Sequence, residues 1–102
     1  LLVRINRELG GNFNLDAFEH RAIWNGAEQR VEMHLASQHA QEVRLAGGVR
    51  IRFEAGETIW TESSYKYTED SIADLGLRTG FAVSTQWIDP EAGFALTLFE
   101  AI

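Results

Sequence analysis

The sequence lacks cysteine, which excludes a disulfide framework and any metal site built on thiolates. No apolar run approaches the roughly 18 residues that a membrane-spanning helix needs. Positive charge is also scarce, because 9 Lys and Arg stand against 15 Asp and Glu and the net charge is −6. Nucleic acids and anionic membrane surfaces attract basic proteins, so we expect neither as a partner.

The sequence also lacks a glycine-rich phosphate loop. Gly10-Gly11 and Gly47-Gly48 do not stand between a strand and a helix, as dinucleotide binding requires, so we interpret both pairs as turns. The three histidines, His20, His34 and His39, have no acidic partner at a familiar ligand spacing. We therefore expect no metal site, and we place the histidines at the surface.

The 102 residues have the length of one globular domain. Residues 1–9 have helical spacing and stop at Gly10-Gly11, like the end of a helix whose beginning has been cut off. This pattern and the absence of an initiator methionine suggest a piece of a longer protein. The apolar residues over 13–24 predict another helix of about two turns, with Asn14 or Asp16 as its cap.

From Arg30 onward apolar and polar residues alternate, which is typical of half-buried strands. Gly47-Gly48 and Ala55-Gly56 predict tight turns between such strands. Residues 29–64 are therefore expected to form an antiparallel meander of about four strands.

The end of the chain changes back to a helical pattern. At Thr68 a hydroxyl cap precedes two carboxylates, which predicts a helix start, and strands are expected over 81–88 and 94–99. The predicted fold class is α+β. The chain closes with a helix followed by two strands, and many doubly wound nucleotide-binding domains end with the same order of elements.

Polar side chains crowd the end of the last meander strand, in the stretch ETIWTESSYKYTED at residues 57–70. The alternation places Trp60 and Glu62 on one face. Residues two apart in a strand share a face about 7 Å apart, so Glu62 and Ser64 can both reach one flat ligand. A carboxylate accepts an N–H and a hydroxyl donates or accepts, which suits a small ring with two nitrogens. The alternative is a polar strand end that caps the next helix.

Met33 lies on the expected inward face of an earlier strand. It is either a filler of the core or part of the lining of a pocket under the meander.

Four separated segments, in order, resemble the carboxy-terminal part of the SAM-dependent histidine Nα-methyltransferases of ergothioneine biosynthesis. That family converts histidine to trimethylhistidine (hercynine). The segments are FNLDAFEHRAIWN at 13–25, RVEMHLAS at 30–37, FEAGETIWTESSYKYT at 53–68 and the pattern GF…WxDP at 80–90.

The resemblance implies a Rossmann-like SAM domain and a second domain that binds histidine. Residues 1–28 would be a helical lead-in, 29–67 the meander of the substrate domain, and 68–102 the terminal helix and two strands that complete the SAM-domain sheet. Glu62 and Ser64 match the family's pair that holds the substrate imidazole, and Met33 matches a methionine that lines the same pocket.

The resemblance also implies what this segment does not supply. The residues that bind S-adenosylmethionine, and those that contact the amino and carboxylate groups of histidine, would all lie upstream of Leu1. We therefore expect the segment to carry no catalytic residue and to be inactive alone, within a cytoplasmic enzyme. Because its last strands would lack their neighbours, we also expect the isolated segment to self-associate.

Two other hypotheses remain open at this point. The segment could belong to a related methyltransferase that acts on another amino acid, such as an indole amino acid. It could also be a free-standing, non-catalytic α+β binding module.

Overall fold

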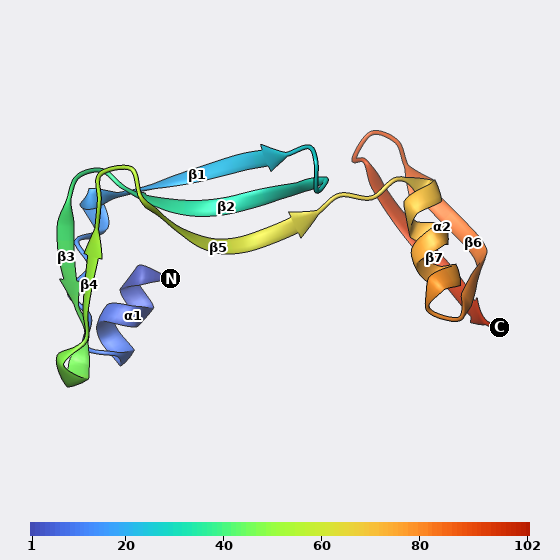
Figure 1. Cartoon of the computed structure of the whole chain (residues 1–102). Coiled ribbons are helices and arrows are strands. Elements are labelled where there is room, and N and C mark those ends of the chain that lie inside the picture. Colours follow the sequence, from blue (N-terminus) through green and yellow to red (C-terminus); the bar gives the residue numbers. More distant parts are fainter. The chain divides into compact units, whose positions relative to one another are not determined.

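The computed structural model describes residues 1–102, which form two compact units, Leu1–Tyr65 and Lys66–Ile102 (Figure 1). The chain is α+β with antiparallel strands, as predicted, and it contains two α-helices. The first unit contains α1 (Leu2–Glu8), the 3₁₀ turn η1 (Leu15–Ala17), β1 (Phe18–Asn25), β2 (Arg30–Ser37), β3 (Gln41–Arg44), the 3₁₀ turn η2 (Ala46–Gly48), β4 (Arg50–Phe53) and β5 (Thr58–Tyr65). The second contains α2 (Glu69–Arg78), β6 (Phe81–Asp89) and β7 (Phe94–Ala101).

Four strands do occupy residues 29–65, but their order is not the meander that the sequence predicts. β2 pairs with β1 on one side and with β5 on the other, and all the pairs are antiparallel. β3 and β4 form a separate two-stranded hairpin, which runs crosswise to the longer strands (Figure 1). Gly47 and Gly48 have φ of +81° and +77° and close this hairpin tightly, so β4 pairs back on β3.

The helix predicted over 13–24 is wrong. Asn14 does act as a cap, accepting a hydrogen bond from the Asp16 backbone N–H at 3.1 Å, but it caps only the short turn η1. The residues that follow form β1, which pairs with β2 along its whole length. A helix of two turns is marginal by itself, and an eight-residue ladder with β2 overrides the helical spacing. The region expected as a helical lead-in, 1–28, therefore contains a long strand.

The hydrophobic core of the first unit lies at one end of the three-stranded sheet. Phe13, Phe18 and Phe53 pack against one another with ring centroids 5.3 to 6.3 Å apart, and Leu2 and Val43 are buried with them. Apolar side chains at the start of β5 and at the end of β2 also pack against this core. The other end of the sheet, where β5 finishes and β2 begins, extends beyond the core.

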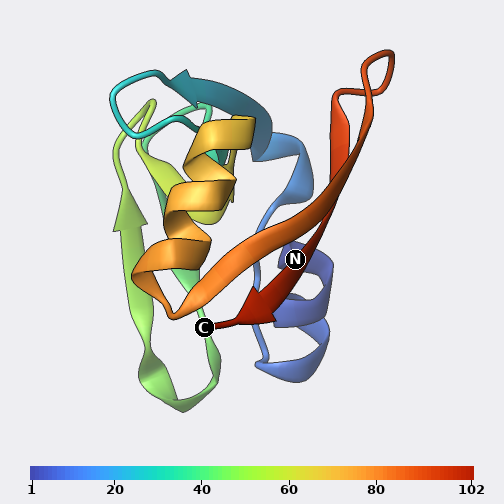
Figure 2. The same ribbon diagram turned by 90° about the vertical axis from the view of Figure 1, so that its right-hand side faces the viewer.

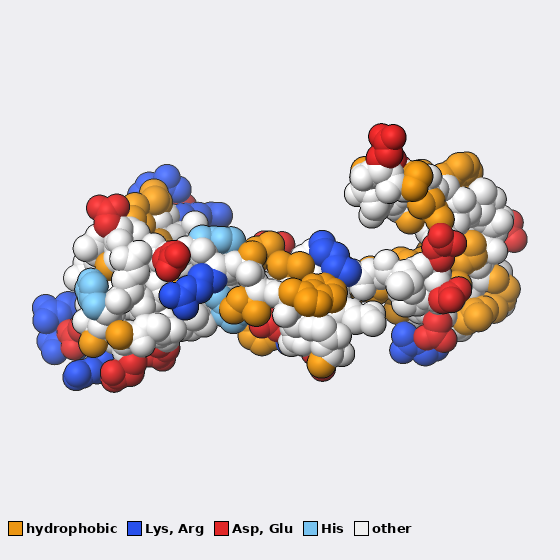
Figure 3. Space-filling model, turned by 90° about the horizontal axis from the view of Figure 1, so that it is seen from above, with side chains coloured by type: hydrophobic (Ala, Val, Ile, Leu, Met, Phe, Trp, Pro, Cys, Tyr) orange, Lys and Arg blue, Asp and Glu red, His pale blue; other side chains and the backbone are white.

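The second unit consists of α2 and the long twisted hairpin of β6 and β7, seen from the side in Figure 2. Helix α2 starts as predicted, because Thr68 and Ser71 form a capping box in which each side chain accepts from the other's backbone N–H. Many apolar side chains of the hairpin are exposed, and orange groups mark hydrophobic side chains at the surface of this unit in Figure 3. Neither helix of the chain is long and apolar enough to cross a membrane.

Candidate functional site

A β-bulge divides β5 at Thr61. His34 of β2 pairs with Trp60, but the preceding residue, Met33, pairs with Glu62, so Thr61 is one extra residue in β5. The Thr61 hydroxyl donates a hydrogen bond to the Met33 carbonyl oxygen at 3.1 Å. The extra residue changes the alternation, and Trp60 and Glu62 therefore lie on opposite faces of the sheet. The shared face expected for these two residues is wrong.

One face of the sheet brings the three predicted residues together. Glu62 is the cross-strand partner of Met33, and Ser64 is the partner of Val31, so all four side chains share a face. Cross-strand partners lie about 5 Å apart, and Glu62 and Ser64 are separated by about 7 Å along their strand. These spacings fit one small planar ligand. β2 and β5 pair without interruption between Met33–Glu62 and Val31–Ser64. The shared face of these four side chains therefore follows from the backbone pairing.

The exposure of these residues suits a binding surface. Glu62 is exposed, whereas Met33 and Ser64 are half-buried. Met33 lies outside the buried core, which is at the other end of the sheet. Trp24 of β1 pairs with Val31 and lies on the same face, where it is exposed. The surface therefore offers a carboxylate, a hydroxyl, a thioether and apolar neighbours.

The opposite face carries a network of charged side chains centred on Glu32. Arg30 Nε donates to Glu32 Oε2 at 2.8 Å, and Asn25 Nδ2 donates to the same oxygen at 3.1 Å. His34 Nε2 lies 3.1 Å from Glu32 Oε1, and its Nδ1 lies 2.9 Å from Thr58 Oγ1. A carboxylate only accepts, so the His34 Nε2–H is the donor to Glu32.

The network perturbs the acidity of its central group. Hydrogen bonds from Arg30, Asn25 and His34 hold the pKa of the Glu32 carboxyl at about 2, below its ordinary value of 4.5. The side chains of Arg30 and Glu32 are only 15% and 12% exposed. Glu32 is therefore a fixed negative charge on this face at physiological pH.

Two aromatic residues of β5 cover the network. Trp60 stacks on His34 with ring centroids 5.8 Å apart and planes 16° apart, and the Arg30 guanidinium carbon lies 4.7 Å from the Trp60 ring centroid. Arg30 Nη1 also donates to the Tyr65 hydroxyl at 2.8 Å. These contacts bury His34, so its expected place at the surface is wrong. The sequence does carry a signal for the network, because Arg30, Glu32 and His34 alternate along one strand.

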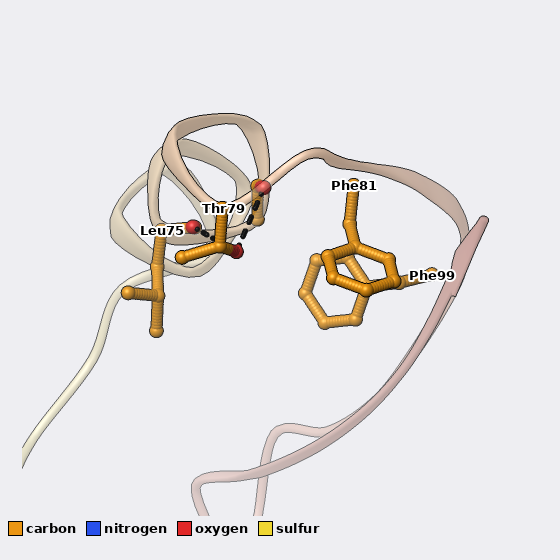
Figure 4. Close-up of a pocket in the computed structure, with 5 residues that line it drawn as sticks. Leu75, Thr79, Phe81 and Phe99 are labelled. Carbon is orange, nitrogen blue, oxygen red and sulfur yellow. Dashed lines mark hydrogen bonds between the residues drawn. The ribbon is translucent and has the colours of Figure 1, made fainter. Parts of the chain in front are cut away.

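A separate hollow of about 230 Å³ lies in the second unit (Figure 4). It is lined by Leu75, Gly76, Thr79, Phe81 and Phe99. The Thr79 hydroxyl donates to the carbonyl oxygens of Leu75 and Gly76 at 2.9 and 3.0 Å, so its polar group is engaged within α2. The remaining lining is apolar and offers no acid or base for chemistry.

The connection from β5 to α2 differs from the glycine-rich turn of a dinucleotide-binding motif. Helix α2 follows β5, but residues 66–68 between them contain no glycine, and its first turn carries Glu69 and Asp70. A glycine-rich turn lets the backbone approach such a cofactor, and this connection offers none. The structure also brings together no group of three His, Asp or Glu side chains that could hold a metal ion.

Comparison with known proteins gives consistent matches over nearly the whole chain. A family described as "Histidine-specific methyltransferase, SAM-dependent" matches residues 1–101. Two curated relatives have the name histidine N-alpha-methyltransferase. The one from Mycolicibacterium smegmatis is 40% identical and the one from Mycobacterium tuberculosis 37% identical, each over 99 residues and 96% of this chain. The chain spans about a third, 31%, of the length of each relative.

Proposed function

The chain belongs to the family of histidine-specific, SAM-dependent methyltransferases, and we propose that it is the part of such an enzyme that recognises the imidazole of histidine. The observation that carries this proposal is the register of β2 and β5. It places a carboxylate, a hydroxyl and a thioether on one open face at the spacing of a small ring. The family relation, and the names of the two relatives, favour histidine as the molecule that occupies this face.

Each of the three residues has a distinct role in this proposal. The exposed Glu62 carboxylate accepts an N–H of the imidazole in a charge-assisted hydrogen bond. The Ser64 hydroxyl bonds the other ring nitrogen, either as donor or as acceptor. Met33, opposite Glu62, packs its polarisable thioether against the ring. A site that hydrogen-bonds both ring nitrogens discriminates against apolar side chains, since these would leave its polar groups unpaired.

Glu62 is assigned to orientation and selection, not to removal of the α-amino proton. The whole enzyme would use S-adenosylmethionine, bound by residues outside this segment, and would form trimethylhistidine (hercynine) in the cytoplasm. The 102-residue segment alone would be inactive. What the described residues contribute is the position of the ring, which fixes where the amino group lies.

The same proposal assigns the second unit to the cofactor domain. Residues 29–67 would belong to the substrate domain, and residues 68–102, which contain α2, β6 and β7, would complete a Rossmann-like sheet. The exposed apolar side chains of the hairpin support this assignment, because Phe94, Leu96 and Leu98 are each more than half exposed in the segment itself. A sheet face of this kind requires a covering layer.

The test uses the full-length protein that contains this segment. Incubation with S-adenosylmethionine and a mixture of the standard amino acids, followed by mass spectrometry, should give trimethylated histidine and no other methylated amino acid. Methylation of a different amino acid would keep the reaction and overturn the assignment of the imidazole. The absence of any product would contradict the proposal as a whole.

The role of Glu62 is tested by calorimetry of histidine binding. Glu62→Ala should weaken binding about 30-fold, the equivalent of one charge-assisted hydrogen bond of ~2 kcal/mol. Glu19→Ala is the matched control, because Glu19 is an exposed carboxylate of the same sheet that pairs with Ala36 on the other face. An equal effect of the two substitutions would show that Glu62 has no specific role.

A further inference from the structure

The backbone of Glu62 is held from the face of the sheet opposite to its side chain. The Trp60 indole Nε1–H donates to the Glu62 carbonyl oxygen at 3.1 Å, across the bulge. We propose that Trp60 is a positioning residue that fixes the bulge and thereby directs Glu62 and Ser64 toward Met33. This inference rests on the proposed function, because it explains how the imidazole-binding residues are held in place.

The bulge needs such a restraint because it is the point where the β2–β5 ladder is interrupted. The extra residue, Thr61, has no cross-strand partner. A strand that slips by one residue moves every following side chain to the other face. Loss of the bulge would turn Glu62 and Ser64 away from Met33 and put Thr61 and Ser63 in their place.

Two side-chain hydrogen bonds restrain the bulge, one to each strand. Trp60 bonds the backbone of β5 at Glu62, and the Thr61 hydroxyl bonds the backbone of β2 at Met33. Both of the backbone groups that are held belong to residues of the proposed imidazole site. The bonds therefore fix the two strands at the point where the carboxylate and the thioether face each other.

Trp60 can act as a restraint because its own ring is held by the network on that face. His34 stacks on the indole, and the Arg30 guanidinium lies over it. Both of these side chains are bonded to Glu32, at 3.1 and 2.8 Å. The physical connection thus runs from Glu32 through His34 and Arg30 to Trp60, and from the indole to the backbone of Glu62.

A double-mutant cycle in the full-length protein tests this inference, with histidine affinity measured by calorimetry. Trp60→Phe keeps an aromatic ring but removes the indole N–H, and should weaken histidine binding about 5-fold, the equivalent of ~1 kcal/mol. In the Glu62→Ala background the same substitution should have a smaller effect, because Glu62 is gone and only Ser64 is still directed toward Met33. An additive loss of about 150-fold in the double variant would overturn the inference.

Further measurements separate positioning from general damage to the fold. Trp60→Phe should raise the KM for histidine and leave the affinity for S-adenosylmethionine unchanged. Trp87→Phe is the matched control, because Trp87 lies in the second unit and is 54% exposed, against 50% for Trp60. If both substitutions raise the KM for histidine equally, the effect is not specific to the bulge and the inference fails.

A second variant keeps the inference testable if Trp60→Phe does not fold. Thr61→Val replaces the hydroxyl by a methyl group and removes the bond to the Met33 carbonyl oxygen. It should weaken histidine binding less in Glu62→Ala than in the wild type, and an effect of the same size in both backgrounds would contradict the inference. Failure of the proposed function would look different, since Glu62→Ala would then bind histidine as tightly as the wild type.

Discussion

Gly76→Ala should destabilise α2, although alanine is the better helix former. A Cβ atom at this position would lie 2.4 Å from Phe99 Cε1, 2.9 Å from Phe99 Cδ1 and 3.3 Å from the Phe81 carbonyl oxygen. The Phe99 ring stands directly against the helix backbone, and the methyl group has to displace it. In Figure 4 the rings of Phe81 and Phe99 face the α2 turn that contains Thr79.

Two opposing free energies decide the size of the effect. Replacing glycine by alanine in a helix interior is worth about 1 kcal/mol in favour of the helix. Overpacking a close contact costs roughly 1–3 kcal/mol. The Cβ would meet a ring atom well inside contact distance, so the second term should exceed the first, and we expect a net loss of about 1 kcal/mol.

The effect is measured by hydrogen exchange of the α2 amides in the full-length protein. A local measurement is needed because a chain with two compact units has no single free energy of unfolding. Phe99→Ala removes the ring, and in that background Gly76→Ala should become stabilising by about 1 kcal/mol. Gly80→Ala is the control, because Gly80 has φ of +88° and open space around its Cβ position, so its cost should not depend on residue 99. The argument fails if Gly76→Ala increases protection while Phe99 is present.

Two further predictions concern the acidity of Glu32 and the isolated segment. The folded-state pKa of Glu32 is depressed from 4.5 to about 2, so its stabilising contribution is complete above about pH 5 and is lost as the pH falls toward 2. The free energy of local unfolding of Glu32→Gln, from hydrogen exchange of the β2 amides, should therefore fall less steeply than that of the wild type between pH 5 and about pH 2, and parallel curves would refute the role of the network. The isolated 102-residue segment should self-associate through its exposed β6–β7 hairpin, and a monomer in light scattering at high concentration would contradict this.

Much of the fold follows from short-range signals in the sequence. The hydroxyl and carboxylates at residues 68–71 predict the start of α2, and glycine pairs and alternation predict most of the strands. The pairing of β2 with β5 was not predictable in this way, because the two strands are separated by the β3–β4 hairpin. β1 was missed because its apolar residues also fit a helix, and only its ladder with β2 decides between the two structures.

The candidate site was predictable as a set of residues but not as a geometry. The spacing of Glu62 and Ser64 places them on one face, and the resemblance to a known family adds Met33. Which face they occupy depends on the bulge at Thr61, and nothing local in the sequence distinguishes Thr61 from an ordinary strand residue. The network around Glu32 was missed because its hydrogen bonds join residues of β1, β2 and β5.

The bulge has a consequence for how the specificity of this enzyme family can change. It separates the two faces of one sheet, with the network around Glu32 on one face and, in the proposed function, the groups that would meet the ligand on the other. Substitutions at Met33 or Ser64 can therefore be selected for a new ligand without altering the side chains that hold Glu62. For protein engineering, the Met33 face is the place to build a library, and Arg30, Glu32, His34 and Trp60 are the positions to leave unchanged.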